Sequence, residues 1–184
     1  MMRIIIGITG ASGFSLASGL IKVLKQKGIE VHLIISEAAR KVASIEGCSI
    51  PSVVSLANKV YTNDQLEASI SSSTYKIDGM VIVPCSLKTL SSVANGHSNN
   101  LISRSAENMM RMGRKLVIMP RETPFSPQAL ENMHKLSAYG VIIMPPVIAY
   151  YTNPKTIDDI NNFFIGKVLD VFNIDHDLPR WKGI

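Results

Sequence analysis

Short apolar runs alternate with amphipathic segments along the chain. Five apolar runs rich in β-branched residues predict strands over residues 3–8, 30–35, 79–83, 115–119 and 141–144. The segments that follow them have helical spacing of apolar residues and predict helices over residues 15–27, 37–46, 88–94, 100–112, 127–139 and 157–172. Because the strand runs are apolar almost throughout, we expect a sheet covered on both faces. The pattern therefore predicts an α/β fold with a single doubly wound, Rossmann-like or flavodoxin-like parallel sheet and helices on both faces.

Capping residues mark the boundaries of two of these helices. Ser126 followed by Pro127 is typical of an N-cap with proline at the first helical position, and Gly140 stands where that helix should stop. Thr156 with Asp159 predicts a capping box for the last helix. Both helices therefore have start signals that do not depend on tertiary contacts.

Length and organisation favour one domain. A chain of 184 residues is close to the usual ~150 residues per domain and is long enough to bury a core without disulfides or structural zinc. Residues 47–75 have no clear period, so they predict an excursion with one or two short elements. Since there is no repeat and no low-complexity linker, we interpret residues 1–184 as a single domain.

The cysteines and histidines show no disulfide or metal pattern. Cys48 and Cys85 are the only cysteines, and neither CxxC nor HxxxH spacing occurs. We therefore expect no metal site and a reducing, cytoplasmic setting. The longest apolar stretch, residues 141–151, is broken by two prolines and is shorter than the ~20 residues of a spanning helix, so no membrane partner is expected.

Positive charge is concentrated in one part of the chain. Of a net charge of +5, residues 101–121 carry +4, because they hold five Lys and Arg residues against Glu107 alone. Such a segment can bind nucleic acid, bind a phosphate-bearing small molecule, or form a solvated helix face. Aromatic residues make up only 6% of the chain and do not interleave with these charges, which disfavours nucleic acid.

Small and polar residues follow the predicted strands, where ligands of open parallel sheets bind. Residues 7–13 form a glycine-rich turn of the kind that lets backbone amides approach a phosphate at a helix N-terminus. Ser36 and Ser86 follow the second and third strands and are equally good helix N-caps. The carboxyl edge of the sheet is therefore the predicted location of a binding site.

The glycine turn also resembles that of short-chain dehydrogenases, and residues 151–155 spell their Tyr-x-x-x-Lys motif. Pro154 lies inside that motif, however, and would prevent the tyrosine and lysine from sharing a helix face. The second strand also ends in Ser36 rather than in an acid that could hold a ribose. This alternative is therefore disfavoured.

Two further strand ends carry candidate chemistry. Arg121 and Glu122 lie between two prolines; the arginine could fork onto a phosphate and the carboxylate could move a proton, or the two could form only a local ion pair. Cys85 reads as a small apolar residue that closes a buried strand, because the sequence offers no partner base for a nucleophile.

With these motifs together, nearly the whole chain resembles the UbiX/Pad1-type flavin prenyltransferases. The resemblance is carried by ordered motifs at matching strand ends, namely residues 10–13, 36–39, 84–90, 99–102 with 104–106, 120–124, Tyr151 with Pro154, and 178–181. It implies a transferase that alkylates reduced FMN with dimethylallyl phosphate at N5 and C6, giving the prenylated FMN that UbiD-type decarboxylases use. It further implies FMN without a metal, and a homo-oligomer, a dodecamer, with sites at subunit contacts.

The resemblance also implies roles for individual residues. Those expected around FMN are Gly10, Ala11, Ser12, Ser36, Ser86, Leu87, Lys88, Thr89 and Arg121. Those expected on the substrate phosphate are Tyr151, Lys167 and, from a neighbouring subunit, Arg111. Those expected to be catalytic are Ser12, Glu46, Glu122 and Tyr151, with Ser12 and Glu122 assisting proton movement near N5.

The chain departs from the family pattern at several of these places. Arg111 stands where the family usually has lysine and Lys167 where it usually has arginine, so charge is kept while bidentate geometry is exchanged. Phe14 and Leu16 replace the usual small residue and tyrosine. Two other hypotheses stay open: an FMN-dependent peptidyl-cysteine decarboxylase, for which His97 is the only histidine candidate and the Pro-x-Met-Asn signature is missing, and a non-catalytic FMN carrier subunit.

Overall fold

The structure, a computed structural model, describes residues 1–178. Three residues of the last family motif, Pro179, Arg180 and Trp181, therefore lie outside the described residues. Contacts within the chain divide it into two compact units, Met1–Pro145 and Pro146–Ile184.

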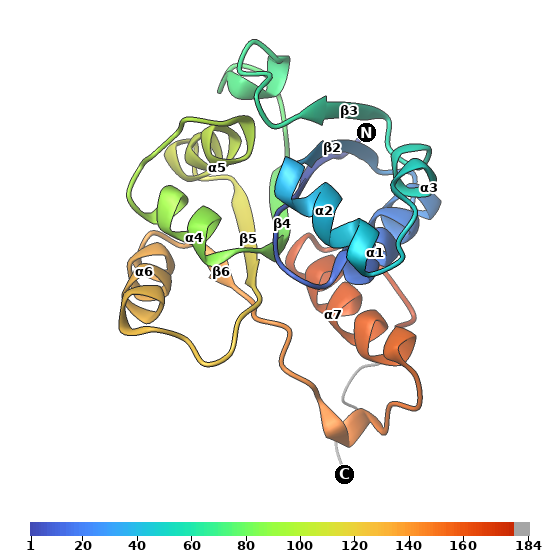
Figure 1. Ribbon diagram of the computed structural model, residues 1–184. Helices are drawn as coiled ribbons and strands as arrows, with labels where there is room; N and C mark the ends of the chain where they lie inside the picture. The colour runs from blue at the N-terminus through green and yellow to red at the C-terminus, as the bar shows by residue number, and fades with distance from the viewer. Residues whose placement is uncertain (179–184) are drawn as a thin grey trace. The chain divides into compact units, whose positions relative to one another are not determined.

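The first unit contains a six-stranded, all-parallel sheet with the order β3-β2-β1-β4-β5-β6 (Figure 1). The strands are β1 (Arg3–Ile8), β2 (Glu30–Ile35), β3 (Lys59–Thr62), β4 (Gly79–Cys85), β5 (Lys115–Pro120) and β6 (Ile142–Ile143). The helices of this unit are α1 (Phe14–Gln26), α2 (Glu37–Ile45), α3 (Ile50–Val54), α4 (Leu87–Ala94), α5 (Leu101–Arg111) and α6 (Pro127–Ala138), with a 3₁₀ turn η1 (Ser69–Ser71). The strand order reverses between β1 and β4, as in a doubly wound sheet.

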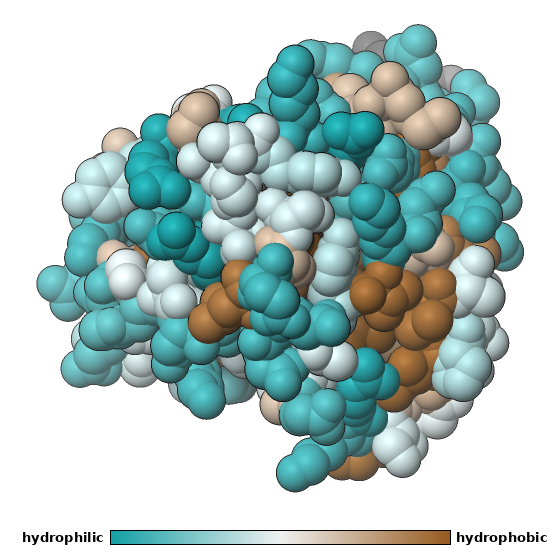
Figure 2. Space-filling model, turned by 90° about the horizontal axis from the view of Figure 1, so that it is seen from above, coloured by the Kyte–Doolittle hydropathy of each residue, from teal (hydrophilic) through white to brown (hydrophobic). Residues whose placement is uncertain are grey.

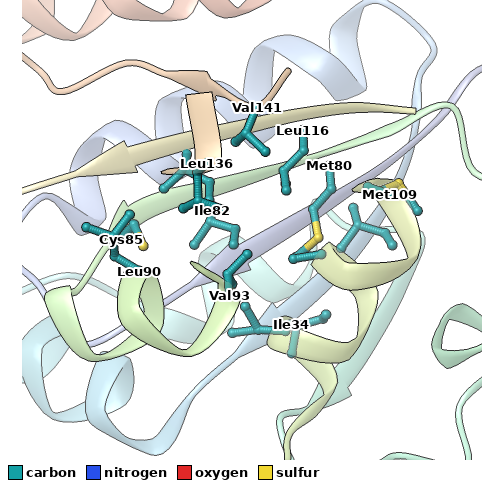
Figure 3. Close-up of a cluster of buried hydrophobic side chains, with 14 of the residues drawn as sticks. Ile34, Met80, Ile82, Cys85, Leu90, Val93, Met109, Leu116, Leu136 and Val141 are labelled. Atoms are coloured by element: carbon teal, nitrogen blue, oxygen red, sulfur yellow. The ribbon is translucent and has the colours of Figure 1, made fainter. Parts of the chain in front are cut away.

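Helices cover both faces of this sheet, as the apolar strand pattern predicts. Helix α1 packs against β1, β2 and β4, and α2 and α3 pack beside α1, while α4, α5 and α6 contact β4, β5 and β6 (Figure 1). Figure 3 shows the core on the second face, where Met80 and Ile82 of β4 meet Leu90 of α4 and Met109 of α5. All four are at most 1% exposed, and full burial of each such side chain contributes roughly 1.5–3 kcal/mol.

The second unit contains a 3₁₀ turn, η2 (Tyr150–Thr152), and helix α7 (Ile157–Val171). The predicted capping box is confirmed: the Thr156 hydroxyl accepts from the Asp159 amide at 3.1 Å, and Asp159 accepts from the Thr156 amide at 2.9 Å. Several large apolar side chains of this unit are exposed, among them Val147, Tyr150 and Ile157. The exposed fractions of these three, 69%, 80% and 71%, leave apolar area for contact with another protein surface.

The other capping predictions also agree with the structure. Ser126 is the N-cap of α6 and accepts the Ala129 amide at 3.2 Å, with Pro127 in the first turn. Gly140 follows the helix with φ +80°, a left-handed conformation that favours glycine. These boundaries depend on local backbone chemistry, which explains why they can be read from the sequence.

The excursion over residues 47–75 is more ordered than expected. It forms three short elements, α3, β3 and η1, rather than one or two, and β3 adds a sixth strand. Strand β3 pairs only with β2, and three of its four residues are exposed. An edge strand with one neighbour does not require an apolar run, so the strand pattern missed it.

Among the described residues, no helix has both the length and the apolar character needed to cross a membrane. The face of the molecule in Figure 2 is mostly hydrophilic, with apolar residues gathered in limited patches.

A buried histidine of β2, His32, contacts the edge strand β3. His32 is 0% exposed, its Nε2 is 2.9 Å from Glu30 Oε1 and its Nδ1 is 3.1 Å from the Tyr61 hydroxyl. Because an ionised carboxylate only accepts, Nε2 carries the proton and Nδ1 accepts from Tyr61. Burial lowers the pKa of His32, partly opposed by Glu30, while the positive charges of Lys59 and Arg3 lower it further. The folded protein therefore favours neutral His32.

This lowered pKa predicts an acid-sensitive stability. Below the ordinary histidine pKa of about 6.5, the unfolded chain binds a proton that the folded chain does not bind. The free energy of unfolding should therefore fall as the pH is lowered from 7.5 to 5.5, and His32→Gln should make that slope shallower. Urea denaturation across this range measures it, with exposed His97→Gln as the matched control; equal slopes for wild type and His32→Gln would contradict the prediction.

Candidate functional site

The carboxyl ends of the central strands bring most of the predicted site residues of the first unit to one edge of the sheet. The ladder between β1 and β4 ends at the pair Gly7 and Ile82, and beyond it the chain turns into α1 on one face and α4 on the other. This divergence is the switch point at which ligands of such sheets bind.

The glycine turn after β1 is held by a carboxylate from α2. Gly13 is the N-cap of α1 with φ +116°, and no side chain of the turn itself caps the helix. Instead the two oxygens of Glu46, the residue that ends α2, accept the backbone amides of Gly13 and Phe14 at 2.8 and 2.9 Å. The carboxylate thus compensates the positive end of α1 and fixes the turn.

Glu46 is also linked to two other predicted site residues. Its burial alone would raise its pKa, but hydrogen bonds from the Ser12 hydroxyl and from the Gly13 and Phe14 amides, together with the charge of Arg121, hold the pKa of Glu46 below its ordinary value. Ser12, Glu46 and Arg121 therefore form one electrostatically connected group, and the carboxylate is ionised at neutral pH.

Close packing explains the glycine at position 10. A Cβ atom there would lie 2.5 Å from the Cβ of Ala38, in the first turn of α2. Ala11 beside it is only 5% exposed, whereas Ser12 is exposed. The turn thus brings its backbone close to α2 and presents Ser12 outward.

Arg121 has an unsatisfied donor. Its backbone amide donates to the Cys85 carbonyl at 3.1 Å, which fixes the residue beside the end of β4. Its side-chain Nε is buried and has no hydrogen-bond partner among the described residues. Because buried polar groups are almost always paired, this N–H is the donor in the first unit that a ligand would most directly satisfy.

A groove of about 550 Å³ lies at the same edge of the sheet. It is lined by Ser36, Glu37, Ala38, Thr62, Asn63, Asp64, Lys88, Asn99 and Asn100. Ser36 and Asn100 are the N-caps of α2 and α5, and Lys88 lies in the first turn of α4. Three helix N-termini and Lys88 offer donors to an anionic group, while the carboxylates of Glu37 and Asp64 also line the groove and oppose it.

Comparisons with known proteins agree with this geometry. Residues 1–169 match the protein family described as Flavoprotein. The chain is 48% identical to the flavin prenyltransferase UbiX of Methanocaldococcus jannaschii over 185 residues, which cover 100% of both chains. The chain belongs to the UbiX flavin prenyltransferase family.

Two solved structures of the family have the same fold. AnUbiX (PadA1), described in complex with FMN and dimethylallyl pyrophosphate, is 36% identical with a TM-score of 0.97, over 100% of this chain and 98% of that chain. A protein from Escherichia coli O157:H7, described as a dodecameric FMN-dependent UbiX-like decarboxylase, is 39% identical with a TM-score of 0.96, over 99% and 100% of the two chains. The family resemblance and the fold class predicted from the sequence are therefore confirmed.

In this UbiX-family chain, the loop after β4 is ordered by its own hydroxyl groups. Ser86 is the N-cap of α4 and accepts the Thr89 amide at 3.3 Å, and its hydroxyl lies 3.2 Å from that of Thr89. Leu87 is half-buried and Lys88 is exposed into the groove. Cys85, at the end of the strand, is fully buried, and this burial raises the pKa of its thiol. The interpretation of Cys85 as an apolar strand residue is confirmed.

Two predicted site residues of the first unit, Glu122 and Arg111, are not part of the group formed by Ser12, Glu46 and Arg121. Glu122 is exposed, and its Oε1 accepts the adjacent Thr123 amide at 3.0 Å. Arg111 is the last residue of α5, and the first end of that helix, at its N-cap Asn100, borders the groove. The eleven residues of the helix separate the two ends by about 16 Å. The Arg111 guanidinium donates to Asn108 Oδ1 at 2.7 Å. Within the first unit, the groove and Arg111 thus lie at opposite ends of α5.

The predicted phosphate residues of the second unit share an aromatic neighbour. The ring of Tyr151 meets Phe163 edge to face, with centroids 6.1 Å apart, and the ammonium of Lys167 lies 5.6 Å from the centroid of the same ring. Sequence reasoning missed Phe163, although its spacing of four from Lys167 places both on one helix face. The aromatic ring of Tyr151 and the ammonium of Lys167 therefore both contact Phe163.

The structure gives less support to the histidine candidate for cysteine decarboxylation. His97, the only histidine considered for cysteine decarboxylation, is exposed and is not among the residues that line the groove. Within residues 1–178, no three His, Cys, Asp or Glu side chains gather in a way that would hold a metal ion.

Proposed function

We propose that this protein is a flavin prenyltransferase that transfers the dimethylallyl group of dimethylallyl phosphate to N5 and C6 of reduced FMN, forming prenylated FMN. Within the family, the observation that carries the proposal is the buried Arg121 Nε, which has no partner in residues 1–178 and belongs to one electrostatic group with Ser12 and ionised Glu46. A donor that lacks an acceptor, next to a proton-accepting pair, fits a site that both binds a heterocycle and moves protons at it.

The residues at the sheet edge fit FMN. Gly10 has no side chain and Ala11 is buried, so neither places a large side chain against a flat ring system. The helix N-cap Ser36 and Lys88 in the groove would serve the FMN phosphate, and Ser86, Leu87 and Thr89 would complete the cradle. The solved AnUbiX relative, which holds FMN, supports this choice of cofactor. When bound, reduced FMN supplies the two nucleophilic atoms to which the five-carbon group becomes attached.

Ser12 and Glu46 are suited to proton handling. The Ser12 hydroxyl donates to the Glu46 carboxylate, which leaves the serine lone pairs available to accept a proton at the exposed side of the turn. The charge of Arg121 adds to the hydrogen bonds that lower the pKa of Glu46, and the buried Nε of Arg121, unpaired among the described residues, supports a role as a donor to the flavin. We propose that Ser12 and Glu46 pass a proton between them as one relay, and that the exposed carboxylate of Glu122 is a further proton acceptor.

The substrate phosphate requires cations because breakage of the allylic carbon–oxygen bond leaves negative charge on it. We propose that Tyr151 and Lys167, which share Phe163, bind this phosphate with Arg111 of a neighbouring subunit. The position of Arg111 at the far end of α5 supports a contribution to another copy's site.

Assembly and context complete the proposal. We propose that residues 1–184 act as one FMN-binding domain within a homo-dodecamer; the exposed Val147, Tyr150 and Ile157 support subunit contacts, as does the dodecameric relative. A UbiD-type decarboxylase would receive the product, and the cytoplasm would be the site of action.

Mass spectrometry of the flavin tests the function directly. Anaerobic incubation with reduced FMN and dimethylallyl phosphate should yield a flavin heavier by one five-carbon unit. If FMN binds but its mass never changes, the protein is a carrier and the prenyltransferase proposal is wrong. Decarboxylation of a peptidyl-cysteine without flavin prenylation would instead favour the decarboxylase alternative.

The role of Glu122 gives a separate prediction. Glu122→Gln should lower prenylation turnover by about tenfold and leave FMN affinity unchanged; because the exposed carboxylate competes with water as an acceptor, we expect less than the ~10²–10⁴ of an enclosed general base. Turnover and an equilibrium flavin titration measure the two effects. Glu131→Gln, an exposed carboxylate on α6, is the matched control, and wild-type turnover of Glu122→Gln would remove Glu122 from the relay.

A further inference from the structure

Neighbouring strand ends at the binding edge are joined by backbone hydrogen bonds, and at the centre of the sheet a side chain adds two further bonds. The Ser36 amide donates to the Ile8 carbonyl at 3.1 Å, and the Arg121 amide donates to the Cys85 carbonyl at 3.1 Å. Both links use only backbone atoms, so among single substitutions only proline, which lacks the amide hydrogen, would remove them. Between β1 and β4 the backbone bond is longer, from the Thr9 amide to the Pro84 carbonyl at 3.3 Å, and the Thr9 side chain adds two shorter bonds.

Thr9 makes two short hydrogen bonds to the loop after β4. Its Oγ1 accepts from the Ser86 amide at 2.7 Å and donates to the Pro84 carbonyl at 2.8 Å, across 77 and 75 positions of sequence. The side chain is 2% exposed, so water cannot replace it easily. Because the regular ladder ends at Gly7 and Ile82, the Thr9 hydroxyl continues the strand pairing beyond that end.

Thr9 contacts both walls of the proposed flavin site, which are the glycine turn at residues 10–12 and the start of α4 at residues 86–89. The Thr9 carbonyl accepts the Ala11 amide at 2.9 Å, which closes the turn that presents Ser12. Its hydroxyl holds the amide of Ser86, whose own hydroxyl caps α4. At a switch point the two helices leave toward opposite faces of the sheet. The backbone bond from the Thr9 amide to the Pro84 carbonyl stops two residues before Ser86, so it is the Thr9 hydroxyl that ties the start of α4 to the end of β1.

We propose that Thr9 is a positioning residue that sets the gap between the glycine turn and the start of α4, and thereby the affinity for FMN. This inference rests on the proposed function, because it takes residues 10–12 and 86–89 as the two walls of the flavin site. Thr9 does not touch the flavin; it acts through Ser86 and the turn.

Thr9→Val keeps the shape of the side chain and removes both hydrogen bonds. It leaves the Ser86 amide without this acceptor, while the Pro84 carbonyl keeps the backbone amide of residue 9, and we expect FMN affinity to fall about tenfold. Thr9→Ser restores the hydroxyl and should restore affinity to near the wild-type value. Ile8→Val, a buried neighbour on β1 that loses one methylene, controls for general loss of stability and should leave FMN affinity unchanged.

The measurements are an FMN fluorescence titration well below the melting temperature of each variant, and prenylation kcat and KM. A purely structural role would lower the melting temperature of Thr9→Val and leave its FMN affinity at the wild-type value, which would overturn the proposal. Equal loss of affinity in Ile8→Val would overturn it as well. Wild-type protein that binds FMN without prenylating it overturns the proposed function, whereas the titration decides the role of Thr9.

A measurement on the wild type covers the case in which Thr9→Val does not fold. The Ser86 amide of the flavin-free protein should exchange slowly with deuterium in NMR spectra, because Thr9 already accepts its proton. If the Ser86 amide exchanges fast while the amides of β4 are protected, the hydrogen bond from Ser86 to Thr9 is absent and the proposal is overturned.

Discussion

Replacing Arg121 with leucine should weaken FMN binding by about 100-fold, the upper part of the range for a hydrogen bond from a charged group. The reason is that the buried Nε of Arg121 has no acceptor among the described residues. A hydrogen bond to a ligand would therefore replace no bond within the protein, and its full free energy would contribute to binding. The Glu46 carboxylate also loses the positive charge that lowers its pKa. Equilibrium titration of the flavin fluorescence measures the change.

Arg121→Lys separates the two effects. Lysine keeps the positive charge toward Glu46 but has no Nε donor in a planar fork, so it should recover less than half of the lost binding free energy. If Arg121→Leu binds FMN with wild-type affinity, the orphaned donor does not face the cofactor and the site must be placed elsewhere on the sheet edge.

Replacing Glu46 with glutamine should lower prenylation turnover by about 10³-fold, within the usual range for loss of a group that moves a proton. The neutral amide cannot accept a proton from Ser12. It also replaces one carboxylate oxygen by an NH₂ group, which faces the backbone amide of Gly13 or Phe14 as a second donor. The free energy of unfolding should therefore fall by about 1–3 kcal/mol.

Turnover assays and urea denaturation measure these two losses independently. Glu67→Gln, an exposed carboxylate outside the group, is the matched control and should change neither value. A Glu46→Gln protein that is destabilised but turns over at the wild-type rate would show that Glu46 only caps α1. In that case Ser12 would need another proton acceptor, and Glu122 would be the next candidate.

Local chemistry explains why so much of the fold can be predicted. The runs at residues 3–8 and 30–35 coincide with β1 and β2, and Ser126 and Thr156 cap the helices that they were expected to begin. Strand β3 has neither an apolar run nor a capping residue that would mark it in the sequence. An exposed edge strand of four residues needs only the hydrogen bonds to its neighbour β2.

The candidate site shows the same division. Ser12, Ser36, Ser86 and Arg121 follow strands in sequence, and parallel strands end at a common edge, so their proximity could be predicted. The place of Glu46 came only from family resemblance, since it is 33 positions from Gly13 and lies at the end of a helix. Phe163 was missed because an aromatic residue on an amphipathic helix reads as core.

The sequence by itself determined the order of five of the six strands of the first unit and of the helices outside residues 47–75, two helix N-caps, the family and the edge of the sheet at which chemistry should occur. These depend on periodicity and on residue types next to one another in the chain. Only the tertiary structure decided that Glu46 holds the glycine turn, that the Arg121 Nε is buried without an acceptor in the described part of the chain, and that Thr9 bridges β1 to the loop after β4. Those features join positions far apart in sequence or depend on burial, and no local pattern encodes either.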